Sequence, residues 1–328
     1  MSTSPVIHTE ETRLGKATDR LIALLPVLIW SVYMFGARVI TLCVISVGFC
    51  FGLDYLIQRY AFRAPKGVRI DPYNAVYGLA AAFLMPVAVP LWIPAVAAVF
   101  TVGAKNLHYR DTRRIFNPYI FSAGAMQLIF RGIMTCYTRP LAYFNAFSFV
   151  IDGDLLARYR VISPLQYLAG GSVFEDGLLP QFIGYSQGNI GEIAILAIML
   201  GSVWMFLRKD GDVKPTFTFC ALIFILAYAF PSKDAEPVYY VFGMLFSGTA
   251  VFIGVHALND GATMPMNSLG RVLTAAVCAL LVFIGRKLFG GFECGYYVIL
   301  AANAAAPFVE KFTRPRVPGA KRKAVRGK

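Results

Sequence analysis

Charged residues are scarce in this chain. Asp, Glu, Lys and Arg make up 15% of its 328 residues, while hydrophobic residues make up 57%. In a soluble domain about a quarter of the residues are charged, which is enough to cover a surface that faces water. The scarcity of charge excludes a soluble globular domain, and the mean hydropathy of +0.60 indicates that lipid is the main solvent.

The chain also lacks the residue spacings of common cofactor and catalytic sites. Its six cysteines are scattered over apolar segments without a C-x-x-C pair, and His8, His108 and His256 are far apart. Neither the phosphate-binding G-x-x-x-x-G-K-[ST] motif nor a G-x-G-x-x-G turn after a strand occurs. We therefore expect no metal site, no catalytic residue and no nucleic-acid partner.

Apolar runs, in contrast, are abundant. A transmembrane helix needs about 20 mainly apolar residues, and such runs recur along the whole sequence. They predict an all-α polytopic membrane protein with about ten transmembrane helices. The ten segments are 21–35, 36–57, 73–86, 88–104, 117–137, 188–207, 216–230, 238–258, 270–285 and 291–309.

Basic residues predict the orientation of these spans. Most of the 31 Lys and Arg residues fall in alternate connections, chiefly 59–69, 105–114, 208–214 and the tail 310–328. Because cytoplasmic loops carry an excess of Lys and Arg, these connections and both termini are expected in the cytoplasm. The same bias explains the net charge of +13 without nucleic acid.

The order of the spans divides the chain into five regions. A cytoplasmic N-terminus (1–20) leads into a first membrane half of five helices (21–137). A long extracytoplasmic loop (138–187) separates it from a second half of five helices (188–309), which ends in a basic cytoplasmic tail (310–328).

The two halves share a short pattern. Leu84-Met85-Pro86 has a counterpart in Thr263-Met264-Pro265, and each is followed about 20 residues on by a base, Lys105 or Arg286. Five spans in each half place the halves in opposite orientations. This predicts two inverted repeats, the arrangement of many transporters.

Three ordered motifs point to a family. The first joins Lys105-Asn106-Leu107 to Arg113-Arg114-Ile115-Phe116-Asn117-Pro118, the second is Gly188-Asn189-Ile190-Gly191-Glu192, and the third runs from Asp260 through Thr263 and Pro265 to Asn303 and Pro307. Their order and spacing resemble those of RnfD, a membrane component of the Rnf electron-transport complex, and of its homologue NqrB, from the sodium-translocating NADH:quinone reductase.

The resemblance implies a function. It suggests a membrane subunit of an ion-translocating oxidoreductase complex in a bacterial inner membrane, which couples electron transfer to cation movement and is inactive without its partner subunits. Two alternatives stay open: a flavin-free paralogue that acts as a scaffold, and a solute or ion transporter, since the family's fold is similar to that of urea transporters.

The resemblance also implies a covalent FMN. In this family a flavin transferase esterifies the FMN phosphate to a threonine of an S-G-A-T motif in the long outer loop. Here the matching position is Ser163, preceded by Val161 and Ile162 instead of glycine and alanine. Ser163 keeps a hydroxyl and is the candidate acceptor, but branched neighbours stiffen the segment, so we expect no attachment.

A second candidate for the flavin is weaker. Thr263 ends the run Asp260-Gly261-Ala262-Thr263, which contains a Gly-Ala-Thr. The predicted topology places it on the cytoplasmic side, where a transferase that works outside does not reach it.

Four further residues have two interpretations each. Asn117 and Pro118 suit a helix start, with Asn as the cap and Pro in the first turn, or an N-terminus that faces an ionic ligand. Glu192 either stabilises a helix start or lies inside the protein as an ion or proton ligand. His256 is either a core residue or a proton relay.

Overall fold

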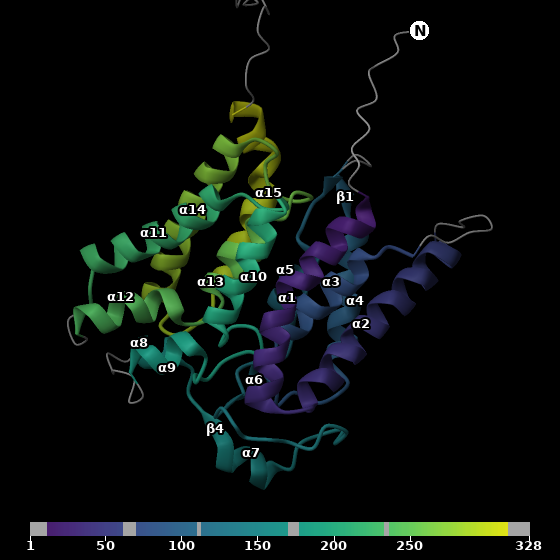
Figure 1. The fold of residues 1–328 in the computed structure, drawn as a ribbon, viewed down its shortest axis with the longest axis vertical. Coiled ribbons are helices and arrows are strands. Elements are labelled where there is room, and N and C mark those ends of the chain that lie inside the picture. Colours follow the sequence, from purple (N-terminus) through teal and green to yellow (C-terminus); the bar gives the residue numbers. More distant parts are fainter. Residues whose placement is uncertain (1–11, 62–69, 110–112, 170–176, 233–235, 314–328) are drawn as a thin grey trace, which may run out of the picture.

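Helices make up most of the computed structural model, which describes residues 12–61, 70–109, 113–169, 177–232 and 236–313 (Figure 1). The first half contains α1 (Arg13–Phe35), α2 (Arg38–Leu56), the π-helix η1 (Ile57–Ala61), α3 (Tyr73–Phe83), α4 (Ile93–Asn106), α5 (Pro118–Ile129) and α6 (Arg131–Met134). The long loop contains α7 (Gly153–Tyr159), α8 (Pro164–Ala169) and α9 (Leu178–Ile183). The second half contains α10 (Ile195–Leu207), α11 (Val213–Ala229), α12 (Pro237–Phe246), α13 (Ala250–Phe252), the π-helix η2 (Ile253–Ala257), α14 (Ser268–Leu288) and α15 (Gly295–Thr313).

Strands are confined, in the described ranges, to two short antiparallel pairs. β1 (His108–Tyr109) pairs with β2 (Arg113–Arg114), and β3 (Tyr137–Thr138) pairs with β4 (Arg160–Val161). The second pair connects the start of the long loop to a segment in its middle. The N-terminal residues 1–11 and the tail from 314, to which the sequence assigns cytoplasmic positions, lie outside the described residues.

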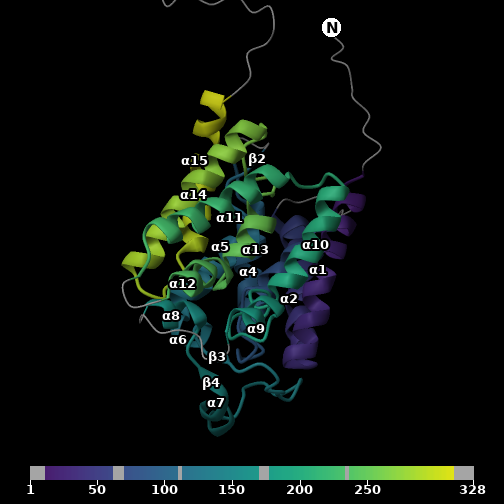
Figure 2. The same cartoon turned by 60° about the vertical axis from the view of Figure 1, so that its left-hand side comes forward.

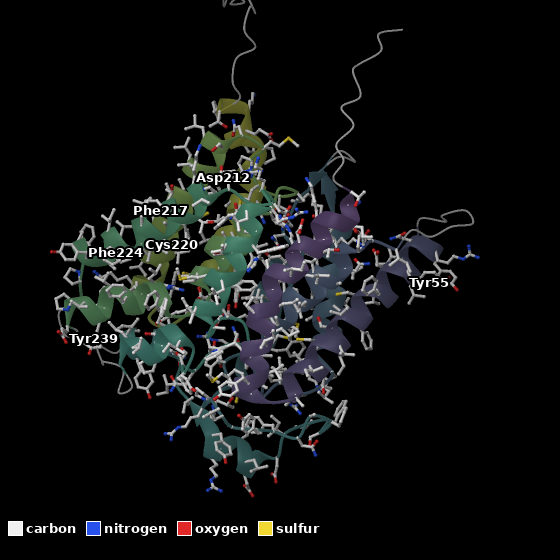
Figure 3. All side chains as sticks on the ribbon, in the orientation of Figure 1. Tyr55, Asp212, Phe217, Cys220, Phe224 and Tyr239 are labelled. Carbon is white, nitrogen blue, oxygen red and sulfur yellow. The ribbon has the colours of Figure 1, made fainter. Side chains whose placement is uncertain are left out.

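The prediction of an all-α polytopic membrane protein is confirmed. Three helices, Arg13–Phe35, Arg38–Tyr60 and Ser268–Leu288, are long and apolar enough to cross a membrane, and α12 with α13–η2 forms a fourth candidate bent by 54°. Large side chains such as Phe217 and Tyr55 are exposed at opposite lateral edges, as Figure 3 shows. The count of ten spans stays a prediction.

The helices of the two halves pack in matching ways. In the first half α2 lies against α3 and α4, and α4 against α5; in the second, α11 lies against α12 and α14, and α14 against α15. The halves meet where α1 contacts α10 and α5 contacts α15, and Figures 1 and 2 both show α1 beside α10. Because each of these contacts joins a helix to its own counterpart, the packing has the form expected of two repeats related by a two-fold axis.

The ends of the molecule are distinct. Figure 1 shows the start of α1 and the end of α15 at the upper end, and α7 and β4 of the long loop at the lower end. The helix bundle lies between them. The start of α1 and the end of α15 therefore lie at the end of the molecule opposite α7 and β4.

Three predicted helices are shorter than the sequence suggests. The segment 73–86 is helical only to Phe83, and the helix expected over 88–104 begins at Ile93, because Pro86 and Pro90 cannot donate the backbone hydrogen bonds that would continue a helix. In the second half the helix expected from residue 188 begins at Ile195. Non-helical backbone therefore follows α3 in the first half and precedes α10 at the start of the second half.

These two stretches bind each other. Ile190 N–H donates to the Met85 carbonyl at 2.9 Å, and Gly191 N–H donates to the Phe83 carbonyl at 2.7 Å. A Cβ at Gly191 would lie 2.6 Å from the Phe83 Cβ, so only glycine permits this approach. We call residues 84–92 and 188–194 the paired breaks.

Arg38 fixes the long loop to the first of these breaks. Its guanidinium is fully buried and donates to the carbonyls of Val87 and Val89 at 3.0 and 2.9 Å, and to those of Asn145 and Ser148 at 2.9 Å each. One side chain thereby supplies donors to four carbonyls that lie outside helices.

Candidate functional site

Glu192 lies in the second paired break, at the contact between the halves. It is 6% exposed, and its carboxylate accepts hydrogen bonds from Asn189 Nδ2 at 2.7 Å, from the Asn189 N–H at 3.2 Å and from the Tyr296 hydroxyl at 3.0 Å. Among the described residues, no basic side chain forms an ion pair with it. A buried carboxylate held only by neutral donors is costly and is a functional candidate within a membrane protein.

This position corrects one of the two interpretations of Glu192. The interpretation as a helix-start residue is wrong, because α10 begins three residues later and its cap position, Ala194, makes no side-chain hydrogen bond. Gly188 lies in the same turn rather than in a helix. The interior interpretation fits the observed burial of Glu192.

One oxygen atom beside Glu192 has no hydrogen-bond partner among the described residues. Asn189 Oδ1 is buried and has no hydrogen-bond partner in the described part of the chain. Carboxylate and amide oxygens are the ligand type that hard cations prefer. The cluster therefore places a carboxylate beside a buried amide whose oxygen has no partner among the described residues. We call Asn189, Glu192 and Tyr296 the Glu192 cluster.

A second polar cluster joins the two halves. Asn117 caps α5 by accepting from the Ile120 N–H at 3.4 Å, which confirms the capping interpretation, with Pro118 in the first turn. The Asn117 side chain also donates to Asp260 Oδ2 at 3.3 Å. The anion that this helix start faces is therefore a carboxylate of the same chain.

Arg20 completes this cluster from α1. Its Nε donates to Asp210 at 2.6 Å, its Nη2 donates to the Asn259 carbonyl at 3.0 Å, and its Nη1 lies 3.8 Å from Asp260. Arg20 is 8% exposed and Asp260 is 3% exposed. The sequence assigned Arg20 to the cytoplasmic N-terminus (1–20); in the structure Arg20 is part of α1 and its guanidinium forms buried ion pairs.

Lys105 and Arg114 are also internal rather than free surface charges. Lys105 Nζ contacts Asp54 at 2.8 Å, Asn74 Oδ1 at 2.6 Å and Asp71 at 3.1 Å, and Arg114 lies 3.6 Å from Asp71. Burial acts to raise the pKa of Asp71, but the Lys105 ammonium, the hydrogen bond from the Tyr73 N–H and the Arg13 guanidinium together lower that pKa below its ordinary value. Asp54, an acid inside an apolar run, was the available sequence signal for this cluster.

His256 lies in η2 and is buried, with its ring 4.8 Å from that of Phe252. Its Nε2 has no hydrogen-bond partner within the described ranges. This is the environment of a core residue, one of its two interpretations. The single turn of π-helix around it is a rare geometry that often occurs at functional sites.

Ser163 has a structural task. Its hydroxyl accepts from the Gln166 N–H at 3.3 Å, while the Gln166 side chain accepts from the Ser163 N–H at 3.2 Å. This reciprocal pair is a capping box at the start of α8, and Ser163 is only 8% exposed. An FMN ester at Ser163 would have to form on a hydroxyl that is buried and already accepts a hydrogen bond in this capping box.

The Thr263 hydroxyl, like that of Ser163, already forms a hydrogen bond within the chain. Its hydroxyl donates to Asp260 Oδ2 at 3.1 Å, and it is 1% exposed in the turn before α14. Ala262 N–H donates to Asp260 Oδ1 at 3.2 Å, so the aspartate organises the turn. The structure does not bring Thr263 and Ser163 together, since they lie in separate clusters.

These features define a class: an α-helical membrane protein with two matching halves, interior helix breaks and buried polar clusters between them. The chain belongs to the family described as NQR2, RnfD, RnfE, whose pattern matches residues 1–319. This confirms the family resemblance seen in the sequence.

Relatives of similar length carry consistent names. The D component of the "Ion-translocating oxidoreductase complex" from Stutzerimonas stutzeri is 27% identical, over 91% of this chain and 90% of the relative. The D component of the "Na(+)-translocating ferredoxin:NAD(+) oxidoreductase complex" from Acetobacterium woodii is 28% identical, over 97% and 95%. The D component of the "Proton-translocating ferredoxin:NAD(+) oxidoreductase complex" from Clostridium ljungdahlii is 23% identical, over 98% and 96%.

The Arg20 ion pairs generate a prediction about stability. Replacing Arg20 by Gln removes the guanidinium that Asp210 and Asp260 contact, and losing one partner of a buried ion pair costs about 3–5 kcal/mol. Replacing Arg13 by Gln is the matched control, because Arg13 is exposed and its partner Asp71 keeps Lys105 and Arg114. Thermal unfolding in detergent should show a large loss for Arg20→Gln and a small one for Arg13→Gln. Equal losses would contradict the assignment of Arg20 as the internal cation.

Proposed function

We propose that this chain is the membrane subunit, equivalent to RnfD, of an ion-translocating ferredoxin:NAD(+) oxidoreductase complex. Relatives aligned over nine-tenths or more of their length carry names of this kind. The observation that carries the proposal is Glu192, a buried carboxylate without a cation partner in the described structure, held where the two halves meet.

Within the complex, Glu192 takes up and releases the transported cation or a proton. Its carboxylate lies in the paired breaks, where main-chain groups of residues 83–85 and 190–191 bind each other instead of continuing helices. A small shift of one half against the other changes the surroundings of Glu192 directly. Such coupling of a buried acid to the interface between repeats is the general arrangement of ion-coupled transporters.

Electron carriers come from partner subunits in this proposal. Ser163 and Thr263 both form hydrogen bonds that shape the backbone, so the chain works without a covalent flavin of its own. Its contribution is the ion pathway and the membrane platform for the redox subunits, and alone it oxidises neither ferredoxin nor NADH. In this proposal the chain is a subunit of the complex and also the flavin-free scaffold that the sequence left open as an alternative. A flavin transferase is then not needed.

The proposed location is the bacterial inner membrane, with both termini in the cytoplasm and the loop 138–187 outside. The basic connections support this orientation by the positive-inside rule. Arg20, Lys105 and Arg114 form ion pairs inside the protein. Without these three residues, the excess of Lys and Arg in the connections expected in the cytoplasm remains.

The function is tested by replacing Glu192 with Gln in the complete complex. Ferredoxin-driven ion uptake into membrane vesicles should fall at least about tenfold, the effect of losing one charge-assisted interaction. Glu236→Gln is the control, because Glu236 is exposed at the start of α12. If Glu192→Gln transports ions as fast as the native complex, while Tyr296 and Asn189 stay in place, Glu192 is a structural residue and the proposal fails.

The flavin is tested by intact-mass spectrometry after coexpression with a flavin transferase. We expect the native chain to gain no FMN, because Ser163 is buried in its capping box. The triple change Val161→Gly, Ile162→Ala and Ser163→Thr restores the Gly-Ala-Thr part of the family motif and should gain one FMN. An FMN on the native chain that Ser163→Ala removes would overturn this part of the proposal.

A further inference from the structure

The turn that carries Glu192 is held by the first half on both sides of one peptide group. The Gly191 N–H donates to the Phe83 carbonyl at 2.7 Å, and the Ile190 carbonyl, which belongs to the same peptide group, accepts from the Ser31 hydroxyl at 2.7 Å. A planar peptide group that is hydrogen-bonded through both its N–H and its C=O is fixed in orientation, because it can rotate only if one of these bonds breaks.

The orientation of this peptide group determines where the Glu192 carboxylate lies. Asn189 and Glu192 flank it: the Asn189 carbonyl accepts from the Glu192 N–H at 3.0 Å, and the Asn189 N–H and side-chain amide donate to the carboxylate at 3.2 and 2.7 Å. Since these bonds close one short turn, a rotation of the peptide group between Ile190 and Gly191 moves Asn189 relative to Glu192. Such a rotation therefore changes the donors that surround the carboxylate.

Ser31 reaches the turn from α1. It is fully buried, and α1 packs against α10, the helix that follows the turn, as Figures 1 and 2 show. A serine or threonine hydroxyl carries one proton, and inside a helix it often donates to the carbonyl four residues earlier. Thr18 of the same helix does so, with its hydroxyl 2.9 Å from the Leu14 carbonyl oxygen. Ser31 instead donates its proton to Ile190, in the other half of the protein.

Ser46 offers a matched comparison. It is also fully buried, in α2, and its hydroxyl donates to the Gly78 carbonyl at 2.7 Å. Gly78 lies inside α3 and outside the paired breaks, so this bond joins two helices of the first half. The two serines therefore form bonds of equal length at equal burial, and only the bond of Ser31 ends beside Glu192.

We infer that Ser31 is a positioning residue for Glu192: its hydroxyl holds the Ile190 carbonyl, fixes the orientation of the turn and thereby sets the affinity of Glu192 for the transported cation. Ser31 does not contact the carboxylate itself and acts through the backbone of the turn. The inference rests on the proposed function of Glu192 and adds the residue of the opposite half that tunes it.

The test uses the complete complex in membrane vesicles. The initial rate of ferredoxin-driven ion uptake is measured against Na⁺ concentration, and against pH in Na⁺-free buffer, for the native complex and three variants. Ser31→Ala deletes the bond to Ile190, Ser31→Cys keeps a weaker donor of similar shape, and Ser46→Ala deletes an equal bond elsewhere. Thermal unfolding of each variant in detergent measures the loss of stability alone.

We expect Ser31→Ala to raise the half-saturating concentration of the driving cation, Na⁺ or H⁺, about fivefold, the effect of one net hydrogen bond, with a maximal rate close to that of the native complex. Ser31→Cys should lie between the two. Ser46→Ala should keep the native half-saturating concentration, although it lowers thermal stability as much as Ser31→Ala does.

Two results would overturn the inference: a loss confined to the maximal rate of Ser31→Ala, or equal half-saturating concentrations in Ser31→Ala and Ser46→Ala. Glu192→Gln in the same assay separates this failure from that of the proposed function. Native uptake by Glu192→Gln refutes the proposed function. Loss of uptake by Glu192→Gln, together with a native half-saturating concentration in Ser31→Ala, refutes only the role of Ser31.

Discussion

The structure depends on one constraint: within lipid, backbone N–H and C=O groups must find partners inside the protein. Helices satisfy this along most of the chain, but each half interrupts its helices, at 84–92 and at 188–194. The interruptions are stable because Ile190 and Gly191 donate to the carbonyls of Met85 and Phe83, and because Arg38 donates to four further carbonyls. The contact between the halves and the position of Glu192 follow from this pairing.

The charged residues inside the protein follow the same constraint. Arg20 and Lys105 each meet a carboxylate from a distant segment of the chain, and Arg286 meets Glu293 from the turn that follows its own helix. Glu192 differs from the carboxylates in these pairs, because its described partners are neutral. A membrane protein tolerates such a group only where the surrounding polar atoms stabilise it, and this contrast makes Glu192 the candidate for binding a transported cation.

Much of the fold could be predicted from the sequence, because apolar runs and basic connections report directly on a membrane environment. The cap formed by Asn117 was also predictable, since its pattern is local. The paired breaks were not: an apolar run such as 188–207 reads as one helix, and nothing within it shows that a distant backbone binds Ile190 and Gly191. The same limit explains why Arg20 and Lys105 read as loop charges, because their partners are distant in the sequence.

The central claim is that the helix bundle spans the membrane, with the long loop and the chain termini on opposite sides. Sided labelling with an impermeant maleimide tests it most directly, in right-side-out and inverted vesicles. One cysteine replaces Phe147 in the loop, which is 82% exposed, and another replaces Met266 in the turn before α14, which is 74% exposed. The account predicts that position 147 is labelled only from outside and position 266 only from the cytoplasmic side. Labelling of both positions from the same side would contradict it.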